Sequence, residues 1–357
     1  MQKVVTIVGA RPQFVKAAVV SRAFENIGDI QEILVHTGQH YDDNMSKIFF
    51  DEMAIRKPDY NLNINGLTHG AMTGQMLEHI EKILLKEQPD IVLVYGDTDS
   101  TLAGALAACK LHIKVAHVEA GLRSENMKMP EEINRILTDR VSNILFCPTA
   151  TAVENLHQEG FKHFNNNIVL CGDVMFDAIK YYLPQARQPK IELPNKYILC
   201  TIHRAENTDN QNILSEIFEA LTKIASSFSP IVIPLHPRTK AKLQQINFNF
   251  SVPNIHFINP VGYFEMLYLI NNSLLVMTDS GGLQKESYFL EKKCVTLRHE
   301  TEWVELVDCK CNILAGTNKE NIVHCTKQQL SFIADFSKQL YGDGFAGKHI
   351  AQYIKSN

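Results

Sequence analysis

Short apolar segments rich in β-branched residues alternate with helix-length segments along almost the whole chain, and this alternation is the strongest constraint on the fold. Strands that read as nearly continuous apolar runs are typical of parallel sheets with helices on both faces. The predicted strands are 4–8, 32–36, 91–95, 114–118, 144–147 and 168–171, followed by 197–201, 231–234, 255–258, 274–278, 294–296 and 312–314. The sequence therefore predicts an α/β protein with two Rossmann-like, doubly wound domains.

The boundary between the two series of strands is the segment 181–195, YYLPQARQPKIELPN, which has three prolines and few apolar residues. A length of 357 residues also favours two domains, at roughly 150 residues per domain. Ligands of open α/β sheets bind beyond the carboxyl ends of the strands. We therefore expect the site in a cleft between the two domains, with its residues directly after strands.

Composition and charge exclude several functional classes. With 35 Lys and Arg against 39 Asp and Glu, the chain lacks the basic surplus of a nucleic-acid or anionic-membrane binder. No apolar run reaches the roughly 18 residues of a membrane span, and the N-terminus has no signal-peptide core. The eight cysteines form no C-x-x-C pair, which is typical of reduced thiols. We expect a cytoplasmic protein that binds neither membrane nor nucleic acid.

The first strand is followed by Gly9-Ala10-Arg11-Pro12 and then Lys16. A glycine turn, a proline at a helix start and two cations suit an anion at a helix N-terminus, and a plain turn with a surface arginine fits equally well. The pattern is not G-x-G-x-x-G, so no nicotinamide cofactor is indicated.

Carboxylates follow the next strands of the first half. Asp97 and Asp99 come after strand 91–95, and Glu119 comes directly after strand 114–118. Helix capping accounts for one of the two aspartates but not for both. Glu119 is either paired with Arg123 or held ready in a site. Glu131 opens the helix that begins at Pro130, where acids also serve as helix-dipole partners.

In the second half, His203 and His236 each follow a strand and each precedes an arginine within two residues. The sharpest local signal is Thr278-Asp279-Ser280-Gly281-Gly282, which runs into a helix and offers backbone N–H groups and a hydroxyl for phosphate oxygens. Glu286, farther along that helix, is placed to reach the hydroxyls of a sugar. No Ser-His-Asp triad, H-E-x-x-H or Walker A pattern occurs. Metal ligation is not expected, with a loosely held Mg²⁺ as the alternative.

These motifs together resemble the non-hydrolysing UDP-N-acetylglucosamine 2-epimerase family. The matching segments run in order from Gly9 to Gly344: GARPQF, GDTDST, HVEAGLR, PEEINR, HRAEN, LHPR, TDSGGLQKE and YGDG. The resemblance implies the glycosyltransferase-B arrangement, with the active site in the interdomain cleft. It also implies an N-terminal acid–base domain of residues 1–172 plus 345–357 and a C-terminal UDP-binding domain of residues 173–344. The segment 345–354 would pack on the first domain.

The chemistry implied by this resemblance is inversion at C2 of a UDP-linked 2-acetamido sugar, by anti elimination of UDP to a glycal and re-addition of UDP. The resemblance makes Asp97, Glu119, Glu131 and His203 catalytic, with the roles of base and acid among the carboxylates left open. The implied substrate-binding residues are Arg11, Lys16, Arg135, His236, Tyr263, Ser280, Gly281, Gly282 and Glu286. No cofactor or metal is implied, and members of the family are typically homodimers.

Three departures from the usual family pattern indicate a particular branch. The chain has Ala10 and Gln13 where the family usually reads G-T-R-P-E, Ala205 where it reads H-R-R-E, and Trp303 where it reads T-E-R-P-E. These variants resemble the branch that acts on UDP-2,3-diacetamido-2,3-dideoxy-D-glucuronate and serves surface polysaccharide synthesis. The candidate partners of its C6 carboxylate are Arg123, Arg204 and Arg298. The activator site of UDP-GlcNAc epimerases has no clear match.

Three alternatives stay open at this point. The first is a UDP-GlcNAc 2-epimerase that gives UDP-ManNAc. The second is a glycosyltransferase of the same architecture, which would need the nucleotide site but not all three of Asp97, Glu119 and Glu131. The third is an inactive nucleotide-sugar sensor, which would need only the UDP contacts. Fold alone does not decide among them.

Overall fold

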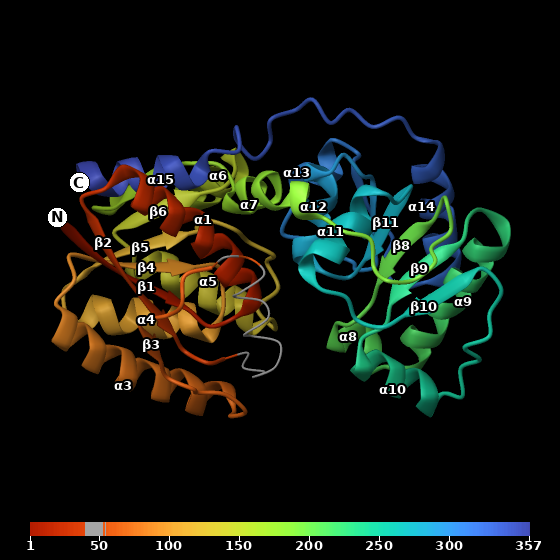
Figure 1. The fold of residues 1–357 in the computed structure, drawn as a ribbon, viewed down its shortest axis with the longest axis horizontal. Helices are drawn as coiled ribbons and strands as arrows, with labels where there is room; N and C mark the ends of the chain where they lie inside the picture. Colours follow the sequence, from red (N-terminus) through yellow and green to blue (C-terminus); the bar gives the residue numbers. More distant parts are fainter. Residues whose placement is uncertain (40–52, 54) are drawn as a thin grey trace. The chain divides into compact units, whose positions relative to one another are not determined.

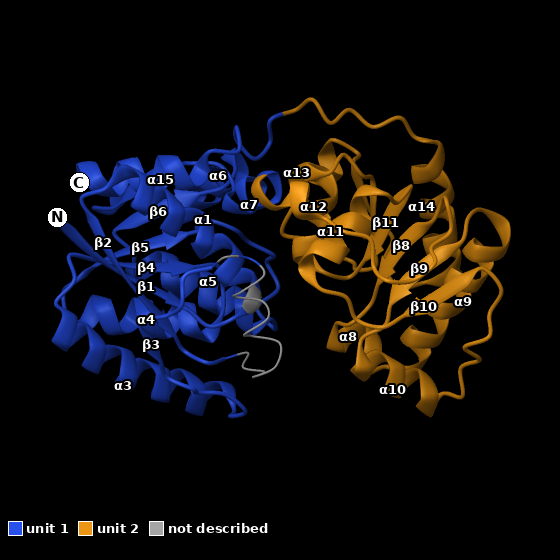
Figure 2. Ribbon diagram, in the orientation of Figure 1, with its two compact units in different colours: residues 1–180, 339–357 blue, residues 181–338 orange. Residues whose placement is uncertain are grey.

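The computed structural model describes residues 1–39, 53 and 55–357, and its chain divides into two compact units (Figure 2). Unit 1 comprises residues 1–180 and 339–357, and unit 2 comprises residues 181–338. Each unit contains one parallel sheet covered by helices (Figure 1). Among the described residues, no helix has the length and apolar character needed to cross a membrane.

Unit 1 is built on a seven-stranded parallel sheet in the order β3-β2-β1-β4-β5-β6-β7. The strands are β1 (Gln2–Val8), β2 (Ile30–His36), β3 (Tyr60–Asn61), β4 (Ile91–Tyr95), β5 (Lys114–Val118), β6 (Ile144–Cys147) and β7 (Asn167–Leu170). The helices of this unit are α1 (Arg11–Ile27), α3 (His69–Glu87), α4 (Asp99–Lys110), α5 (Pro130–Val141), α6 (Ala150–Gln158), most of α7 (Val174–Tyr182) and α15 (Ala346–Ser356). In Figure 1, α3 and α4 lie on one face of the sheet and α1 and α15 on the other.

Unit 2 has a six-stranded parallel sheet in the order β10-β9-β8-β11-β12-β13. Its strands are β8 (Ile198–Thr201), β9 (Ile231–Pro234), β10 (Ile255–Ile258), β11 (Leu275–Thr278), β12 (Cys294–Thr296) and β13 (Asn312–Leu314). Its helices are α8 (Ala205–Thr208), α9 (Gln211–Ser227), α10 (Pro237–Gln245), α11 (Tyr263–Asn271), α12 (Gly281–Phe289), α13 (Val304–Asp308) and α14 (Lys319–Ser331).

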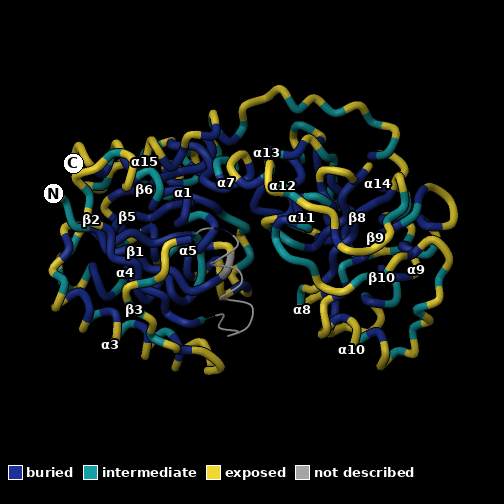
Figure 3. Tube along the Cα trace, in the orientation of Figure 1, coloured by how far each residue is buried: buried dark blue, intermediate teal, exposed yellow. Residues whose placement is uncertain are grey.

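The two sheets confirm the predicted fold class. All twelve predicted strands are present, each within two residues of its predicted bounds, and the structure adds β3. Figure 3 shows that the central strands of both units are buried, whereas exposed residues gather on the outer helices and loops; the edge strands β3, β7 and β10 are only partly buried. The apolar runs read as strands because helices cover both of their faces.

The chain returns to unit 1 at its C-terminus. The backbone N–H of Asp173 donates to the carbonyl of Tyr341 at 3.0 Å. The carboxylate of Asp177, in α7, accepts the N–H groups of Ala346 and Gly347 at 3.0 and 2.9 Å and thereby caps α15. These bonds tie the start of α7 to the C-terminal segment. The units accordingly divide at 180/181 and 338/339, whereas the sequence analysis placed the boundaries at 172/173 and 344/345.

Candidate functional site

The carboxyl ends of β4 and β5 in unit 1 bring Asp97 and Glu119 into neighbouring loops. Gly96 and Glu119 both have left-handed backbone conformations, with φ of 62° and 71°. Such a conformation is uncommon for a glutamate and costs energy unless the surroundings enforce it. Here the Gly96 N–H donates to the carbonyl of Val118 at 2.9 Å and the Glu119 N–H donates to that of Phe146 at 3.1 Å. Neighbouring strand ends therefore hold both turns.

Asp97 is held by a bidentate contact from Arg135 of α5. Nε and Nη2 of Arg135 donate to Oδ2 of Asp97 at 3.0 and 2.7 Å, and Nη1 donates to Glu132 at 2.6 Å. Asn134 of the same helix donates to the carbonyl of Asp97 at 3.0 Å. Because Asp97 is 31% exposed while Arg135 and Glu132 are buried, the aspartate is the solvent-facing member of this group.

Glu119 forms an ion pair with Lys16 of α1. The two side chains are 5% and 13% exposed, so the pair is nearly shielded from water. A Cβ atom on Gly96 would lie 3.3 Å from Oε2 of Glu119 and 4.0 Å from Nζ of Lys16. The Gly96 turn thus lies directly against this pair, next to Asp97. The structure brings Asp97, Glu119, Lys16 and Arg135 together at the carboxyl end of the sheet.

Glu131 lies apart from these contacts, although it is on the same helix. Its residue is exposed, whereas its neighbour Glu132 is fully buried. The Glu132 carboxylate accepts the backbone N–H groups of Ser124 and Glu125 at 2.9 Å as well as the guanidinium of Arg135. The sequence analysis passed over Glu132. The signal available for it was its inward position on α5, one residue from Glu131 and three from Arg135.

Gln13 organises the turn after β1. Its Oε1 accepts the N–H groups of Gly9 and Ala10 at 2.7 and 3.0 Å, and its Nε2 donates to the carbonyl of Tyr95 at 2.6 Å. The side chain therefore links the loop after β1 to the loop that carries Asp97. The side chain of Arg11 is not among those that the structure describes, so its predicted contact remains a prediction.

Arg123, one of the three candidate partners for a substrate carboxylate, is fully engaged within unit 1. It donates to Asp139 at 2.8 Å and to both oxygens of Glu159 at 2.5 and 2.9 Å. Its side chain is 8% exposed. Arg123 is not paired with Glu119, which was one of the sequence alternatives, because Lys16 holds that glutamate.

In unit 2, buried Asp279 organises the loop after β8. Its carboxylate accepts the backbone N–H groups of His203 and Arg204 at 3.1 and 3.0 Å and the side-chain amide of Asn207 at 3.1 Å. The His203 ring stays 47% exposed, with Nδ1 3.5 Å from Asp279. Asp279, directly after β11, therefore positions His203. Its signal in the sequence was an aspartate at the strand end, directly before Ser280.

Ser280 caps α12, where its Oγ accepts the N–H of Leu283 at 3.4 Å. Gly281 and Gly282 are the first two residues of this nine-residue helix. The N–H groups of a helix's first turn have no partner within the helix and attract anions. A Cβ on Gly281 would lie 3.5 Å from Glu302 Oε2 and 3.9 Å from both Arg204 Nη2 and Arg298 Nη1, so two guanidinium groups and one carboxylate flank this helix start.

Trp303 and Arg298 support the same helix start from the loop after β12. The Trp303 indole N–H donates to the carbonyl of Gly281 at 3.0 Å. Arg298 is buried and contacts Glu302 through Nη1 and Nη2 at 3.1 and 3.3 Å. Trp303 is one of the residues that differ from the usual family pattern, and its hydrogen bond to Gly281 stabilises the glycine turn. Among the described residues, no carboxylate pairs with the guanidinium of Arg204.

Tyr263, Glu286 and His236 complete the predicted residues of unit 2. Burial, with a smaller contribution from the negative charge of Glu286, raises the pKa of the Tyr263 phenol well above its usual range. His236 caps α10 by accepting the N–H of Arg238 at 3.2 Å. Partial burial, together with the positive charges of His203 and Arg238, lowers the pKa of His236.

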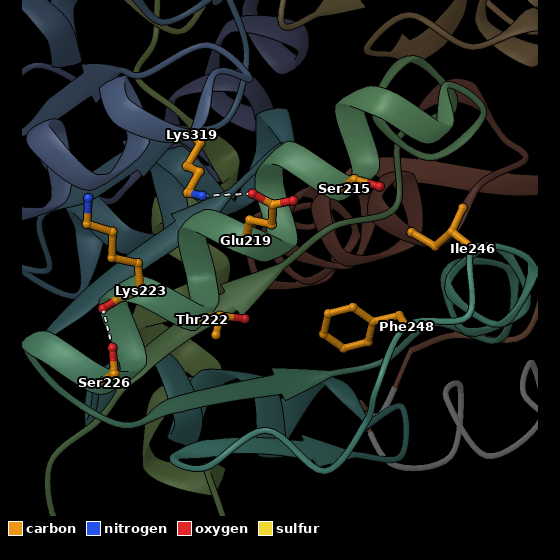
Figure 4. Close-up of a pocket in the computed structure, with 8 residues that line it drawn as sticks. All are labelled: Ser215, Glu219, Thr222, Lys223, Ser226, Ile246, Phe248 and Lys319. Carbon is orange, nitrogen blue, oxygen red and sulfur yellow. Dashed lines mark hydrogen bonds and ion pairs between the residues drawn. The ribbon is translucent and has the colours of Figure 1, made fainter.

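A cluster of metal-binding side chains or a surface pocket can also mark a functional site in the part of the chain that the structure describes. No group of three or more His, Cys, Asp or Glu residues could hold a metal ion there. One surface pocket lies between α9, the start of α14 and the Ile246–Phe248 segment, where Lys319 points toward Glu219 at 2.7 Å (Figure 4). It contains none of the predicted site residues.

Comparison with known proteins identifies the family. The sequence profile described as UDP-N-acetylglucosamine 2-epimerase matches residues 22–355. The chain is 53% identical to UDP-2,3-diacetamido-2,3-dideoxy-D-glucuronate 2-epimerase of Pseudomonas aeruginosa, over 99% of both chains. It is 54% identical to a UDP-N-acetylglucosamine 2-epimerase homolog of Methanococcus maripaludis, again over 99% of both.

A solved structure agrees with this assignment. The crystal structure of Methanocaldococcus jannaschii UDP-GlcNAc 2-epimerase in complex with UDP-GlcNAc and UDP matches with a TM-score of 0.91 and 43% identity, over 100% of both chains. The chain belongs to the UDP-N-acetylglucosamine 2-epimerase family and is an isomerase that acts on nucleotide sugars.

Proposed function

We propose that this protein is a 2-epimerase that converts UDP-2,3-diacetamido-2,3-dideoxy-D-glucuronate into its mannuronate epimer. The observation that carries the proposal is the 53% identity to the Pseudomonas aeruginosa enzyme of that name over nearly the full length of both chains. Identity to the Methanocaldococcus jannaschii UDP-GlcNAc 2-epimerase is lower, at 43%. The alternative is a UDP-GlcNAc 2-epimerase that gives UDP-ManNAc, and the 54% identical homolog is the observation in its favour.

The proposed reaction runs by elimination and re-addition. A base removes the proton from C2, the C2–H electrons form the C1–C2 double bond of a glycal, and the C1–O bond breaks to release UDP. UDP then attacks C1 while an acid delivers a proton to the opposite face of C2. Atoms and charges balance without an oxidant, so the cycle requires no nicotinamide. Opposite faces require separate acid and base groups.

Unit 1 supplies the acid–base groups in this proposal. Asp97 and Glu119 lie in adjacent loops and each is paired with a cation, Arg135 for Asp97 and Lys16 for Glu119. Buried cations near a carboxylate both orient it and compensate charge as a proton moves. Glu131 is the third carboxylate of the set, and its exposed position leaves it available to substrate.

Unit 2 binds UDP in this proposal. The start of α12, with Ser280, Gly281 and Gly282, accepts the diphosphate, whose charge rises as the C1–O bond breaks. His203, held at its backbone by Asp279, contacts the same diphosphate with its exposed ring. Glu286 binds the ribose hydroxyls, and Tyr263 and His236 line the nucleotide site.

The C6 carboxylate of the proposed substrate needs a cation, and Arg204 is the best placed of the three candidates. Arg123 is occupied by Asp139 and Glu159, and Arg298 by Glu302. The Arg204 guanidinium is partly exposed and would lie 3.9 Å from a Cβ on Gly281. An unpaired arginine is suited to a carboxylate, which it can bind through two parallel hydrogen bonds.

The same proposal includes a biological role, a location and an oligomeric state. The manno-configured product would serve the synthesis of a surface polysaccharide such as an O-antigen or capsule. The enzyme would work in the cytoplasm as a homodimer, without a metal or organic cofactor.

The test is proton NMR in D₂O with UDP-2,3-diacetamido-glucuronate and UDP-GlcNAc offered separately. We expect exchange at C2 and a manno product from the uronate, with a rate on UDP-GlcNAc at least about 100-fold lower, which corresponds to about 2.7 kcal/mol. Asp97→Asn is the matched inactive control. Comparable rates on the two sugars would favour the UDP-GlcNAc alternative, and no exchange with either would refute the 2-epimerase proposal.

A further inference from the structure

His117 lies at the centre of unit 1 with both ring nitrogens engaged. It is in β5, two residues before Glu119, and its side chain is fully buried. Its Nδ1 is 2.7 Å from Oδ1 of Asp139, and its Nε2 is 2.7 Å from the carbonyl oxygen of Gly96. Neutral imidazole has one donor nitrogen and one acceptor nitrogen, so the identity of the two partners determines which protons the ring carries.

Both partners are acceptors. A backbone carbonyl cannot donate, so Nε2 carries a proton. The other oxygen of Asp139 accepts the N–H of Gly121 at 3.1 Å and Nη1 of Arg123 at 2.8 Å, an arrangement that stabilises the ionised carboxylate. Burial opposes ionisation of Asp139, whereas the Gly121 N–H and the charged Arg123 guanidinium on Oδ2 favour the ionised form. An ionised carboxylate also only accepts, so Nδ1 carries a proton as well.

The geometry thus assigns His117 as a buried imidazolium that positions the two loops bearing Asp97 and Glu119. The inference rests on the proposed function for its catalytic consequence, but the protonation of the ring can be measured without any activity.

The charges around His117 support this assignment. Asp139 of α5 faces Nδ1, Arg123 faces Asp139 from the loop after β5, and Glu159 in turn binds Arg123. With the imidazolium this set contains two cations and two anions, and the charge of Glu159, which is 29% exposed, lies at its solvent side. Burial and, to a smaller extent, the charge of Asp139 raise the pKa of the buried Cys147 thiol, so it stays uncharged. The Lys16–Glu119 pair also lies next to Gly96.

The positioning effect acts through Gly96. Strand β5 binds both polar backbone groups of this residue, its N–H through the Val118 carbonyl and its carbonyl through His117. Gly96 directly precedes Asp97, and Val118 directly precedes Glu119. One ring therefore couples the left-handed turn before Asp97 to the left-handed turn at Glu119. Removing the Nε2 donor would leave the partly buried Gly96 carbonyl without this partner and release both turns.

Two matched variants separate the two bonds. In His117→Gln the amide nitrogen takes the place of Nε2 and keeps the bond to Gly96. In His117→Asn the amide nitrogen takes the place of Nδ1 and keeps only the bond to Asp139. We expect kcat to fall by about 100-fold in the Asn variant and by about tenfold or less in the Gln variant, with UDP affinity within about threefold of the wild type in both. Thermal melting shows whether both variants fold.

The spectroscopic test is two-dimensional ¹H–¹⁵N correlation of the histidine rings in the full-length protein. The His117 signals are assigned as those lost in His117→Gln. We expect both ring nitrogens to bear protons at pH 7, with N–H protons protected from solvent exchange.

Each outcome decides one question. A non-protonated ring nitrogen at pH 7 would overturn the imidazolium assignment, and equal kcat values for the Asn and Gln variants would overturn the positioning role. An inactive wild type in which both nitrogens are protonated would refute the proposed function while leaving the assignment of His117 in place.

Discussion

Lys16 in α1 and Glu119 after β5 are 103 residues apart in the sequence, yet they form a nearly buried ion pair against the Gly96 turn. Each side chain is the other's partner in a region with little water, where charge interactions are stronger than at the surface. The pair joins the helix after the first strand to the loop that carries the acid–base candidates.

Replacing Glu119 by glutamine tests its assignment as an acid–base group. Glu119→Gln keeps the shape of the side chain but removes its capacity to take a proton, so we expect kcat to fall by at least about 1,000-fold. UDP affinity, measured by calorimetry, should stay within about tenfold because most of the proposed nucleotide contacts belong to unit 2. A loss of UDP affinity of roughly 2 kcal/mol or more would show that Glu119 is misassigned.

Glu131 and Glu132 form a matched pair for separating catalysis from structure. Glu132→Gln should destabilise the protein by about 2–4 kcal/mol, because the buried carboxylate accepts two backbone N–H groups and pairs with Arg135. Glu131→Gln should leave the melting temperature unchanged, since this residue is exposed, and lower kcat by at least about 100-fold.

The opposite pattern would move the catalytic assignment from Glu131 to Glu132. Thermal melting and the C2 exchange rate, both measured on the two purified variants, distinguish these outcomes.

The fold class could be predicted from the sequence because each buried parallel strand appears as a continuous run of apolar residues. This pattern located β4 and β5 to the residue, whereas two-residue β3 (Tyr60–Asn61) is too short to produce any periodic signal. Asp97 and Glu119 could be found for a related reason: they follow buried strands directly, where a carboxylate is unexpected.

The partners of those residues could not be found in the same way. Lys16 and Glu119 meet only because α1 and β5 pack in the folded unit, and no local pattern encodes that contact. Glu131 and Glu132 are chemically identical neighbours in one helical turn. Which of them is buried depends on the rotation of α5 against the rest of unit 1, and sequence spacing alone left this open.

His203 and Asp279 are expected to act together on UDP. His203→Ala should weaken UDP binding by about tenfold and lower kcat, because the exposed ring is lost. Asp279→Asn should weaken UDP binding at least as much. The Asp279 carboxylate accepts three N–H groups, whereas the side-chain nitrogen of an asparagine is itself a donor and would face some of those donors. Calorimetry with UDP measures both effects, and an unchanged rate in His203→Ala would remove this histidine from the mechanism.

Packing of α15 on α1 depends on a glycine. A Cβ on Gly347 would lie 2.6 Å from Cγ1 of Val19 and 3.2 Å from its carbonyl oxygen, so Gly347→Ala should destabilise the protein by about 1–3 kcal/mol. Gly74→Ala is the control, since Gly74 lies in the exposed part of α3 with no atom within 4 Å of its Cβ position. That change should stabilise by about 0.5–1 kcal/mol. Thermal melting measures both effects. A change in melting temperature of the same sign in the two variants would contradict the close contact between Gly347 and Val19.

Asp177 gives the stability of unit 1 a defined pH dependence. Burial is the main cause that raises its pKa from 3.8 to about 6, and the N–H groups of Gly347 and Ala346 only partly oppose it. The folded state therefore binds a proton more readily than the unfolded state. The resulting stability is fully present below pH 3.8 and is lost as the pH rises through about 6, a change of up to about 3 kcal/mol.

Asn at this position cannot ionise, so Asp177→Asn isolates that contribution. We expect the melting temperature of the wild type to fall relative to that of the variant as the pH is raised from 4 to 7.5, with most of the change complete by about pH 7. Measuring the difference between the two proteins cancels the other titrating groups. If the difference in melting temperature stays constant over this range, the Asp177 carboxyl does not titrate there in the folded state and is ionised from pH 4 to pH 7.5.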